Sequence, residues 1–218
     1  LSPETKIIGA EPEGAPSMHK SLKYNSLISL DKINPFVDGA AVKKVGNLNF
    51  EICKKNLDDM LLVKEGALCS EILELYNKDA IVVEPAGALS ISALDQYKNE
   101  IIGKNVVCIV SGSNNDITRM EEKKEKALLH NGLKHYFLVK FPQRSGALRD
   151  FVVNILGKDD DITHFEYTKK NYKDKGSAVV GLEIKNEKSL EKLIQKMKLK
   201  GFYGEYLNNK PILLETLV

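Results

Sequence analysis

The order of hydrophobic patterns between residues 134 and 208 constrains the fold of this chain more than any other feature. Three stretches have the character of strands, KHYFLVKFP, DITHFEYTKK and SAVVGLEIK, with a turn at NYKDKG before the third. Stretches with helical spacing, GALRDFVVNILG and SLEKLIQKMKLKG, follow the first and the third strand, and YGEYLN closes the unit as a fourth strand. The order βαββαβ is that of a ferredoxin-like domain.

The spacing of apolar residues in this unit predicts which side chains form its core. Residues two apart in a strand lie on one face, as do residues three and four apart in a helix. We therefore expect the core to contain apolar side chains of the first helix (Leu148, Phe151, Val152, Ile155 and Leu156), the third strand (Ala178, Val180, Leu182 and Ile184) and the second helix (Leu190, Leu193, Ile194 and Met197).

The first 118 residues follow a different pattern, in which strand and helix signals alternate. Strands are predicted at 5–10, 60–63 and 106–110, the last of them apolar throughout, as expected for a strand covered on both faces. Helices are predicted at 47–57, at 65–78 and within AIVVEPAGALSISALDQY. Such alternation indicates an α/β layer with a parallel sheet, here of three or four strands.

The inward faces of these helices are predicted in the same way. The first is expected to begin at an Asn47 cap, because asparagine favours helix starts. The side chains expected to face inward are Phe50, Cys53 and Leu57 in the first helix, Leu68, Ile72, Leu75 and Tyr76 in the second, and Leu94 and Tyr97 in the third.

The N-terminal pattern reads as part of a domain. Three or four strands make a thin sheet, and the chain opens almost directly on a strand, so we expect the earlier part of this α/β domain to precede Leu1. We divide the chain into an α/β segment at 1–118, a charged linker helix at 119–133 that ends near Gly132, the ferredoxin-like unit at 134–208, and a tail at 209–218.

Composition excludes several classes of protein. The net charge of +2, with lysines interleaved among glutamates, gives no electrostatic footprint for nucleic acid. No apolar run approaches the roughly 18–20 residues that cross a bilayer, and the N-terminus lacks the pattern of a signal peptide. Cys53, Cys69 and Cys108 lie in apolar segments without metal-binding spacing, so we expect reduced core thiols in a cytoplasmic protein. A reactive cysteine is the alternative, but no histidine lies close in sequence.

The stretch VVCIVSGSNND at 106–116 is the first candidate for a functional site. In open α/β sheets, ligands bind outside the carboxyl ends of the strands, and Ser111 is the first polar residue after the predicted strand. Its hydroxyl can donate and accept a hydrogen bond, and Gly112 would let a ligand approach the backbone. The alternative is structural, because Ser113 and Asp116 match a capping box for the next helix.

The stretch EPAGAL at 84–89 is the second candidate. It places Glu84 before Pro85 and Gly87 at the entry to an apolar helix. The carboxylate could be a charge favoured by the helix dipole, or it could line the same crevice as Ser111.

Several motifs, taken in their order and spacing, resemble one enzyme family. TKIIGAEPEGAPSM, DGAAVKKVG, EPAGALSISAL and IVSGSNND resemble the second half of the catalytic region of the threonine dehydratases, which are tryptophan-synthase-β-like (type II) pyridoxal-phosphate enzymes. The βαββαβ unit, with HYFLVKFPQRSGALRDF and DITHFEY, resembles the ACT-like regulatory domain of that family, present here once. The resemblance covers almost the whole chain.

The resemblance implies a pyridoxal-phosphate-dependent conversion of L-threonine to 2-oxobutanoate and ammonia in isoleucine biosynthesis. It implies that Ser111 faces the pyridine nitrogen of the cofactor, that Glu84 orients the cofactor or nearby groups, and that Gly112 and Asn114 belong to the cofactor site. The family's Schiff-base lysine lies in an upstream motif that these 218 residues lack, as they lack the glycine-rich phosphate loop. No lysine is expected in an apolar setting that would lower its pKa, so this chain alone should not catalyse the reaction.

The resemblance also implies an effector site in the ACT-like unit. The loop PQRSGAL contains Arg144, Ser145 and Gly146, and backbone amides at the helix start would suit a carboxylate. Isoleucine is the expected effector, with valine possible, although Arg144 could equally be an ordinary exposed arginine. Asn154 and His164 are interpreted as surface or packing residues. The family suggests a homodimer or homotetramer.

Two other functions remain open from the sequence. The chain could be a non-catalytic amino-acid-sensing module that kept a decayed half-domain, although the intact EPAGAL and IVSGSN stretches argue against decay. It could also belong to a type II lyase acting on serine, which would share the catalytic motifs but usually lack the ACT-like unit. An upstream lysine motif would favour either enzyme over the sensor.

Overall fold

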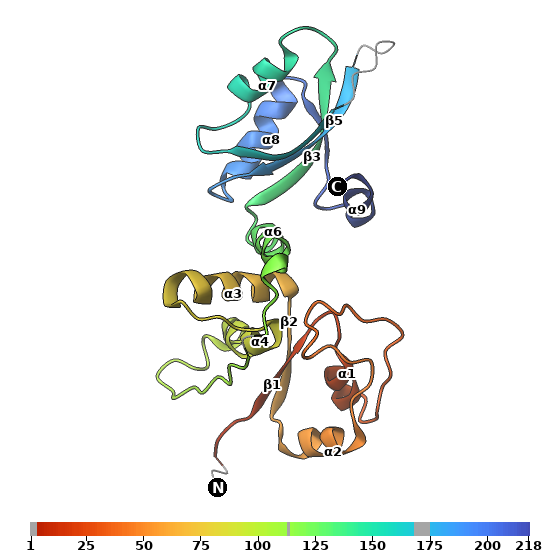
Figure 1. Ribbon diagram of the computed structural model, residues 1–218, viewed down its shortest axis with the longest axis vertical. Coiled ribbons are helices and arrows are strands. Elements are labelled where there is room, and N and C mark those ends of the chain that lie inside the picture. Colours follow the sequence, from red (N-terminus) through yellow and green to blue (C-terminus); the bar gives the residue numbers. More distant parts are fainter. Residues whose placement is uncertain (1–3, 113, 168–174) are drawn as a thin grey trace. The chain divides into compact units, whose positions relative to one another are not determined.

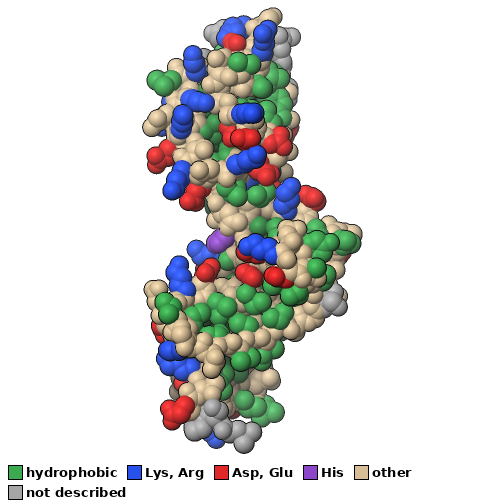
Figure 2. Space-filling view, turned by 90° about the vertical axis from the view of Figure 1, so that its left-hand side faces the viewer, with side chains coloured by type: hydrophobic (Ala, Val, Ile, Leu, Met, Phe, Trp, Pro, Cys, Tyr) green, Lys and Arg blue, Asp and Glu red, His purple; other side chains and the backbone are tan. Residues whose placement is uncertain are grey.

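The computed structural model describes residues 4–112, 114–167 and 175–218. The chain forms two compact units, Leu1–Ala127 and Leu128–Val218 (Figure 1). Each unit has a hydrophobic core of its own. Among the described residues, no helix combines the length and apolar character needed to span a membrane. Lysines and arginines lie among aspartates and glutamates on the face drawn in Figure 2, in keeping with a net charge of +2.

The second unit has the βαββαβ order predicted from the sequence. Its elements are β3 (Lys134–Pro142), α7 (Ala147–Asn154), β4 (Asp161–Tyr167), β5 (Lys175–Glu183), α8 (Ser189–Leu199) and β6 (Tyr203–Tyr206). The strands form one antiparallel sheet in the order β4-β5-β3-β6, so the first strand of the unit lies in the middle. The predicted turn at NYKDKG falls largely outside the described residues.

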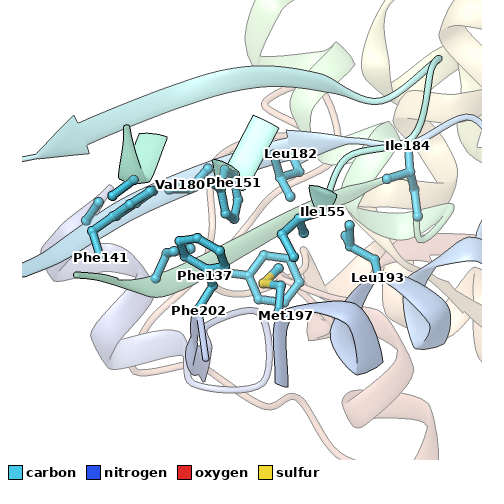
Figure 3. Close-up of a cluster of buried hydrophobic side chains, with 13 residues drawn as sticks. Phe137, Phe141, Phe151, Ile155, Val180, Leu182, Ile184, Leu193, Met197 and Phe202 are labelled. Carbon is cyan, nitrogen blue, oxygen red and sulfur yellow. The ribbon is translucent and has the colours of Figure 1, made fainter. Parts of the chain in front are cut away.

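The core of this unit lies between the sheet and the two helices α7 and α8 (Figure 3). The alternation predicted for β5 is confirmed, because Ala178, Val180, Leu182 and Ile184 are all buried. In α8, Leu193 and Met197 are buried, and Leu190 and Ile194 pack against the core while partly exposed. The alternating pattern of one strand therefore located this core correctly.

The predicted inner face of α7 is partly wrong. Phe151 and Ile155 are buried as expected, but Leu148 is 47% exposed and Val152 43%. The helix buries a single row of side chains four residues apart, which begins at Ala147, so residues one position along the chain turn by about 100° onto its flank. Leu156 packs against the core while partly exposed.

The tail predicted at 209–218 contains a helix, α9 (Pro211–Leu217). Pro211 occupies the first helical turn, where its missing N–H costs nothing. Leu214 and Leu217 pack against a second cluster of the unit, formed by Tyr136, Val179 and Leu207.

A helix rich in charge, α6 (Met120–His130), follows a short 3₁₀ turn at Ile117–Arg119. Its end is a Schellman motif, in which the Leu133 N–H donates to Leu128 O (2.9 Å) and the Gly132 N–H to Leu129 O (3.3 Å). Gly132 has a φ of +64°, which confirms the prediction that it follows the helix end.

The first unit contains a parallel pair of strands and several helices. The strands are β1 (Ile8–Pro12) and β2 (Asp59–Val63), and the helices are α1 (Ser17–Lys23), α2 (Asn47–Asn56), α3 (Glu65–Asp79), α4 (Pro85–Ser92) and α5 (Leu94–Tyr97). Its hydrophobic cluster joins α3 and α4 to β2 and to Phe36 and Val37. The sequence predicted an α/β unit here, but it did not predict the helix α1.

The strand predicted at 106–110 is wrong. The described structure has two strands in this unit where three or four were expected, and Val107 is 89% exposed and Ile109 82%. An apolar run becomes a buried strand only when neighbouring strands take its backbone hydrogen bonds, and no strand of the described structure pairs with this segment. The segment is held instead by α4, where Ser90 Oγ donates to Ile109 O at 2.8 Å.

Three smaller predictions in this unit are also wrong. The N-cap of α2 is Gly46, so Asn47 is the first helical residue rather than the cap. Tyr76 is 52% exposed, because α3 buries the row Leu68, Ile72 and Leu75 and leaves the next position on its flank. Of the cysteines expected in the core, Cys69 is buried, whereas Cys53 and Cys108 are only half-buried.

Candidate functional site

The site in the first unit is built on the start of α4. Glu84 is the N-cap residue in an extended conformation (φ −72°, ψ 159°), and Pro85 follows at the first helical position, where its fixed φ suits the helix. The carboxylate of Glu84 therefore lies at the positive end of the helix dipole.

The structure brings Glu84 and Ser111 together, although they are 27 residues apart. Ser111 Oγ donates a hydrogen bond to Glu84 Oε1 at 2.9 Å, and the backbone N–H of Glu84 donates to Gly112 O at 3.2 Å. Two bonds in opposite directions thus fix residues 111 and 112 against the helix start. Both side chains expected to line a common crevice are in contact.

Two glycines make this contact possible. A Cβ on Gly87 would lie 1.9 Å from Ser111 O, and a Cβ on Gly112 would lie 2.4 Å from Glu84 Cδ. Gly112 also has a φ of +68°, a conformation that side chains rarely adopt. The sequence interpretation named Gly87 without a role in the contact. Its signal was a glycine in the first turn of an otherwise apolar helix.

Gly39 is a further residue that sequence reasoning missed. A Cβ there would approach Ala86 Cβ to 3.0 Å, so the loop that carries Asp38 and Gly39 lies against the first turn of α4. The signal was the DG pair within the motif DGAAVKKVG.

Asn114 is not part of this contact. It is exposed, and no hydrogen bond of the described structure joins it to Glu84 or Ser111. The proposed capping serine, Ser113, lies outside the described residues. Asp116 is itself the N-cap of the 3₁₀ turn, and its carboxylate accepts from the Thr118 N–H at 2.9 Å.

The expectation that no lysine lies in a setting that lowers its pKa is wrong. Lys123, on α6, is 1% exposed, and burial lowers the pKa of its ammonium. Its Nζ donates to Asn115 Oδ1 and, at 3.4 Å, to Asp116 O. The burial of this lysine had no sequence signal, because the surrounding stretch RMEEKKEK resembles a solvated helix face.

A hollow of about 800 Å³ lies elsewhere in the first unit. Its lining comes from β1, from α4 and α5, and from the extended segment 104–109, and it contains neither Glu84 nor Ser111. Several of its walls are exposed apolar side chains, among them Val106, Val107 and Ile109.

The second unit has a smaller hollow of about 210 Å³ beside the loop that joins β3 to α7. Phe141, Phe165 and Leu148 supply apolar surface, and Tyr167 and Gln143 supply polar atoms. Gln143 Nε2 donates to the Tyr167 hydroxyl at 2.8 Å, while Gln143 Oε1 is buried and has no hydrogen-bond partner among the described residues. A buried acceptor without a donor is costly, so this oxygen is available to a donor group that enters the hollow.

The residues predicted for the effector surround the same hollow only in part. Gly146 lines it and precedes α7 with a φ of +80°. Arg144 lines it too, but its guanidinium bonds Asp150 and the carbonyl of the exposed Ser145 (3.3 Å). Gln143 was missed by the sequence interpretation, because nothing in its spacing shows that one amide oxygen is orphaned.

The two residues interpreted as surface or packing residues have those positions. Asn154 is exposed at the end of α7. His164 is half-buried on β4, and its ring meets Tyr136 edge-on with centroids 6.2 Å apart.

Comparison with known proteins gives the family. The family model of pyridoxal-phosphate dependent enzymes matches residues 1–112. The chain belongs to this family. The family model described as the C-terminal regulatory domain of threonine dehydratase matches residues 125–217. The fold class expected from the sequence is therefore confirmed, with a segment of a pyridoxal-phosphate enzyme followed by an ACT-like unit.

The most similar relatives include two bacterial proteins named L-threonine dehydratase biosynthetic IlvA. Those from Halalkalibacterium halodurans and Bacillus subtilis are each 54% identical over 100% of this chain and 52% of their own length. The chain thus spans about half the length of the curated relatives it matches. The processed form of threonine deaminase isoform 2 from Solanum lycopersicum is 35% identical, with a TM-score of 0.56 over 59% of this chain and 36% of that one.

The residues at the start of α4 fit an edge of pyridoxal phosphate, the cofactor of this family. Ser111 is exposed, so its hydroxyl is open to a ligand, and Gly112 carries no side chain that would obstruct an approach. The hydroxyl of Ser111 has one proton, which it donates to Glu84 here and which it could donate instead to the nitrogen of a ligand ring. An uncharged hydroxyl that can donate in this way is a suitable partner for a ring nitrogen that carries no proton.

Proposed function

We propose that this chain is the C-terminal part of a threonine dehydratase, which converts L-threonine to 2-oxobutanoate and ammonia and is inhibited by isoleucine. The observation that carries the proposal is the hydrogen bond from Ser111 to Glu84, at the position where the family is expected to face its cofactor. The names of the most similar relatives support the reaction.

The residues of this chain would orient the cofactor rather than react with the substrate. Pyridoxal phosphate, when bound, supplies the electron sink that makes loss of the α-proton and of the β-hydroxyl possible. Ser111 would donate its hydroxyl proton to the pyridine nitrogen in place of Glu84, and Glu84 would hold that hydroxyl in position until the cofactor binds. A hydroxyl carries no charge to retain a proton on the nitrogen, which moderates the sink and suits elimination. Gly112 would let the ring approach the backbone.

The rest of the catalytic domain would come from the part of the relatives that this chain does not match. The Schiff-base lysine and the phosphate loop belong there, and residues 1–118 would complete the domain. The extended segment 104–109 has exposed β-branched side chains and borders a hollow of about 800 Å³, so further strands could pack against it. Residues 119–133 would link this domain to the regulatory unit at 134–208, with 209–218 as a C-terminal extension.

The effector site is proposed at the hollow beside Gln143. Its volume of about 210 Å³ falls below the roughly 300–1,000 Å³ of pockets for drug-sized ligands, which suits a molecule as small as an amino acid. Gln143 Oε1 would accept from the ammonium group, and the amides after Gly146 would bind the carboxylate. Phe141, Phe165 and Leu148 would contact a branched aliphatic side chain, so isoleucine is proposed as the effector, with valine as a weaker one.

The catalytic proposal is tested in a fusion that places this chain after the part of the Bacillus subtilis relative that precedes the matched region. Formation of 2-oxobutanoate from L-threonine is measured, with L-serine as the competing substrate. The fusion should be active, the chain alone inactive, and Ser111→Ala in the fusion should lower kcat by roughly 10- to 100-fold, as misplacement of the cofactor does. Ser26→Ala is the matched control. Activity of the Ser111→Ala fusion equal to that of the parent would remove Ser111 from the site.

The regulatory proposal is tested by calorimetric titration of the chain with isoleucine, valine and threonine. Isoleucine should bind saturably, and Gln143→Leu should weaken that binding by roughly 10-fold, because a hydrogen bond to a charged group is lost. Gln195→Leu makes the same change on the exposed side of α8 and should leave the affinity unchanged. Binding in a chain whose fusion has no activity would favour an amino-acid sensor, and no binding by a folded chain would refute the effector site.

The assembly is proposed to be a homodimer or homotetramer, as the family suggests. Light scattering of the fusion after gel filtration measures its mass directly. A monomeric mass at micromolar concentration would refute this proposal.

A further inference from the structure

The inner face of α6 carries cations where a helix usually carries apolar side chains. Arg119, just before the helix, stacks on the Phe36 ring at 4.8 Å, and Lys126 lies 4.6 Å from the same ring while it pairs with Glu65 at 2.9 Å. Lys123 lies between them on the same face, four residues after Arg119 and three before Lys126, and it is the most deeply buried of the three.

The partners of Lys123 differ from those of the other two cations. Arg119 and Lys126 contact Phe36 and Glu65, which belong to the body of the first unit. Lys123 contacts Asn115 Oδ1 and Asp116 O, which lie four and five residues after Ser111. Its ammonium therefore holds residues 115 and 116, which end a segment that begins at Ser111 beside Glu84.

Because Lys123 is buried, the loss of its hydrogen bonds to residues 115 and 116 would be costly. Lysine is almost never fully buried unless its charge has partners, and a side chain that is 1% exposed cannot turn to water without moving its helix. Among the described residues, Asn115 Oδ1 and Asp116 O are the hydrogen-bond acceptors of its Nζ. Residues 115 and 116 are thus fixed by a donor whose own position is set by α6.

The beginning of the segment is fixed less firmly than its end. Residues 111 and 112 are exposed, and the bonds that join them to Glu84 measure 2.9 and 3.2 Å. Exposed hydrogen bonds contribute little on their own, because water competes for both partners. A second tie further along the segment restricts how far Ser111 can move from Glu84.

We propose that Lys123 is a positioning residue, which holds Asn115 and Asp116 from α6 and so keeps the Ser111 hydroxyl at Glu84. The effect that Lys123 has on the position of Ser111 is inferred from the contacts alone. The effect that this has on catalysis rests on the proposed function. In the described structure Lys123 has no hydrogen bond to Glu84 or Ser111, and it acts through its contacts with Asn115 and Asp116.

The structural consequence is tested in the 218-residue chain by amide hydrogen exchange resolved by NMR. The Glu84 amide reports the segment directly, because its bond is accepted by Gly112 O. In Lys123→Met, exchange at Glu84 and Thr118 should be faster by about 10-fold, with other protected amides unchanged. Methionine fills a similar volume without a buried charge, so the fold should persist.

Two controls separate positioning from general loosening of the helix. Lys126→Met removes a cation of the same face that contacts Glu65 and Phe36, and it should leave exchange at Glu84 unchanged. Asn115→Ala removes the acceptor and should reproduce the effect of Lys123→Met, and the double variant should add nothing further. Unchanged exchange at Glu84 in Lys123→Met, or an equal increase in Lys126→Met, would overturn the proposal.

The catalytic consequence is tested in the fusion described above. Lys123→Met should shift the absorbance spectrum of the bound cofactor and lower kcat by about 10-fold, while KM for threonine and the affinity for isoleucine stay within twofold. Lys123→Arg, which keeps donors at this position, should recover part of the activity. An active parent with an unchanged Lys123→Met variant would refute the inference, whereas an inactive parent would refute the proposed function and leave the exchange experiment to decide the role of Lys123.

Discussion

Replacing Gly87 by alanine should break the contact between Ser111 and Glu84 while leaving the stability of the fold nearly unchanged. The added Cβ would lie 1.9 Å from Ser111 O, where ordinary contact begins at about 3.4 Å, so the carbonyl would have to move by about 1.5 Å. A displacement of that size breaks the 2.9 Å bond from Ser111 to Glu84. Because residues 111 and 112 are exposed, they can swing outward rather than compress the core.

The stability terms of this change nearly cancel. Alanine is favoured over glycine inside a helix by up to about 1 kcal/mol, and an exposed hydrogen bond contributes roughly 0.5–1.5 kcal/mol. The thermal midpoint should therefore stay within about 4 °C of the parent for a chain of this size. In the fusion, kcat should fall by roughly 100-fold, because a 1 Å misplacement near reacting atoms has effects of that order.

The assay combines thermal unfolding of the chain with activity of the fusion. Gly66→Ala, the same change near the start of α3, should leave activity intact. Activity of Gly87→Ala within twofold of the parent would refute the reasoning about the contact. A fall of more than 10 °C in the thermal midpoint would show instead that Ser111 is held as part of the core.

Other parts of the chain give further predictions. Burial lowers the pKa of His135 in the folded chain. The stability that the neutral imidazole contributes is therefore present above the unfolded-state pKa of about 6.5 and is lost as pH falls through the lower pKa of the folded state. Between about pH 7.5 and 5, the thermal midpoint should fall less in His135→Gln than in the parent or in the control His130→Gln. Burial raises the pKa of the Cys69 thiol to about 12, so a thiol reagent should titrate this cysteine only after unfolding, and Cys69→Ala should leave the count of reactive thiols in the native chain unchanged. Phe151→Ala, in a ring cluster with centroids 5.4 Å from Phe141, should lower the free energy of unfolding by about 3–5 kcal/mol, against less than about 0.5 kcal/mol for the exposed control Val153→Ala in urea titrations.

The sequence predicted the second unit well because the apolar residues that β5 directs to the main core lie two positions apart. Ala178, Val180 and Leu182 alternate with residues of the other face, and such a pattern has only one register that buries the apolar set. The segment 106–110 has no alternation to fix it. Its apolar composition shows that the segment favours burial, but it does not show which strands would pair with it.

The site was predictable residue by residue but not as an arrangement. Ser111 and Glu84 each stood out as a polar group at the end of an apolar run, and their hydrogen bond depends on a chain path that no local spacing describes. Gln143 gave no functional signal, because an orphaned oxygen exists only in three dimensions. Gly87 stood out as a glycine in an apolar helix, but its close approach to Ser111 could not be read from the sequence. Lys123 appeared solvated for the same reason.

The flank of α7 has a consequence for how this unit can evolve. Leu148 faces the small hollow while 47% exposed, and Phe165 does so while 39% exposed, whereas the core row of the helix is sealed beneath them. The lining of the proposed effector site therefore has two parts, flank positions such as Leu148 and Phe165 and core positions such as Phe141 and Ala147. Substitutions on the flank would change the molecule that fits the proposed site at little cost in stability, whereas substitution of Phe141 would also disturb the fold. Descendants of this domain are therefore expected to diverge first at the flank positions.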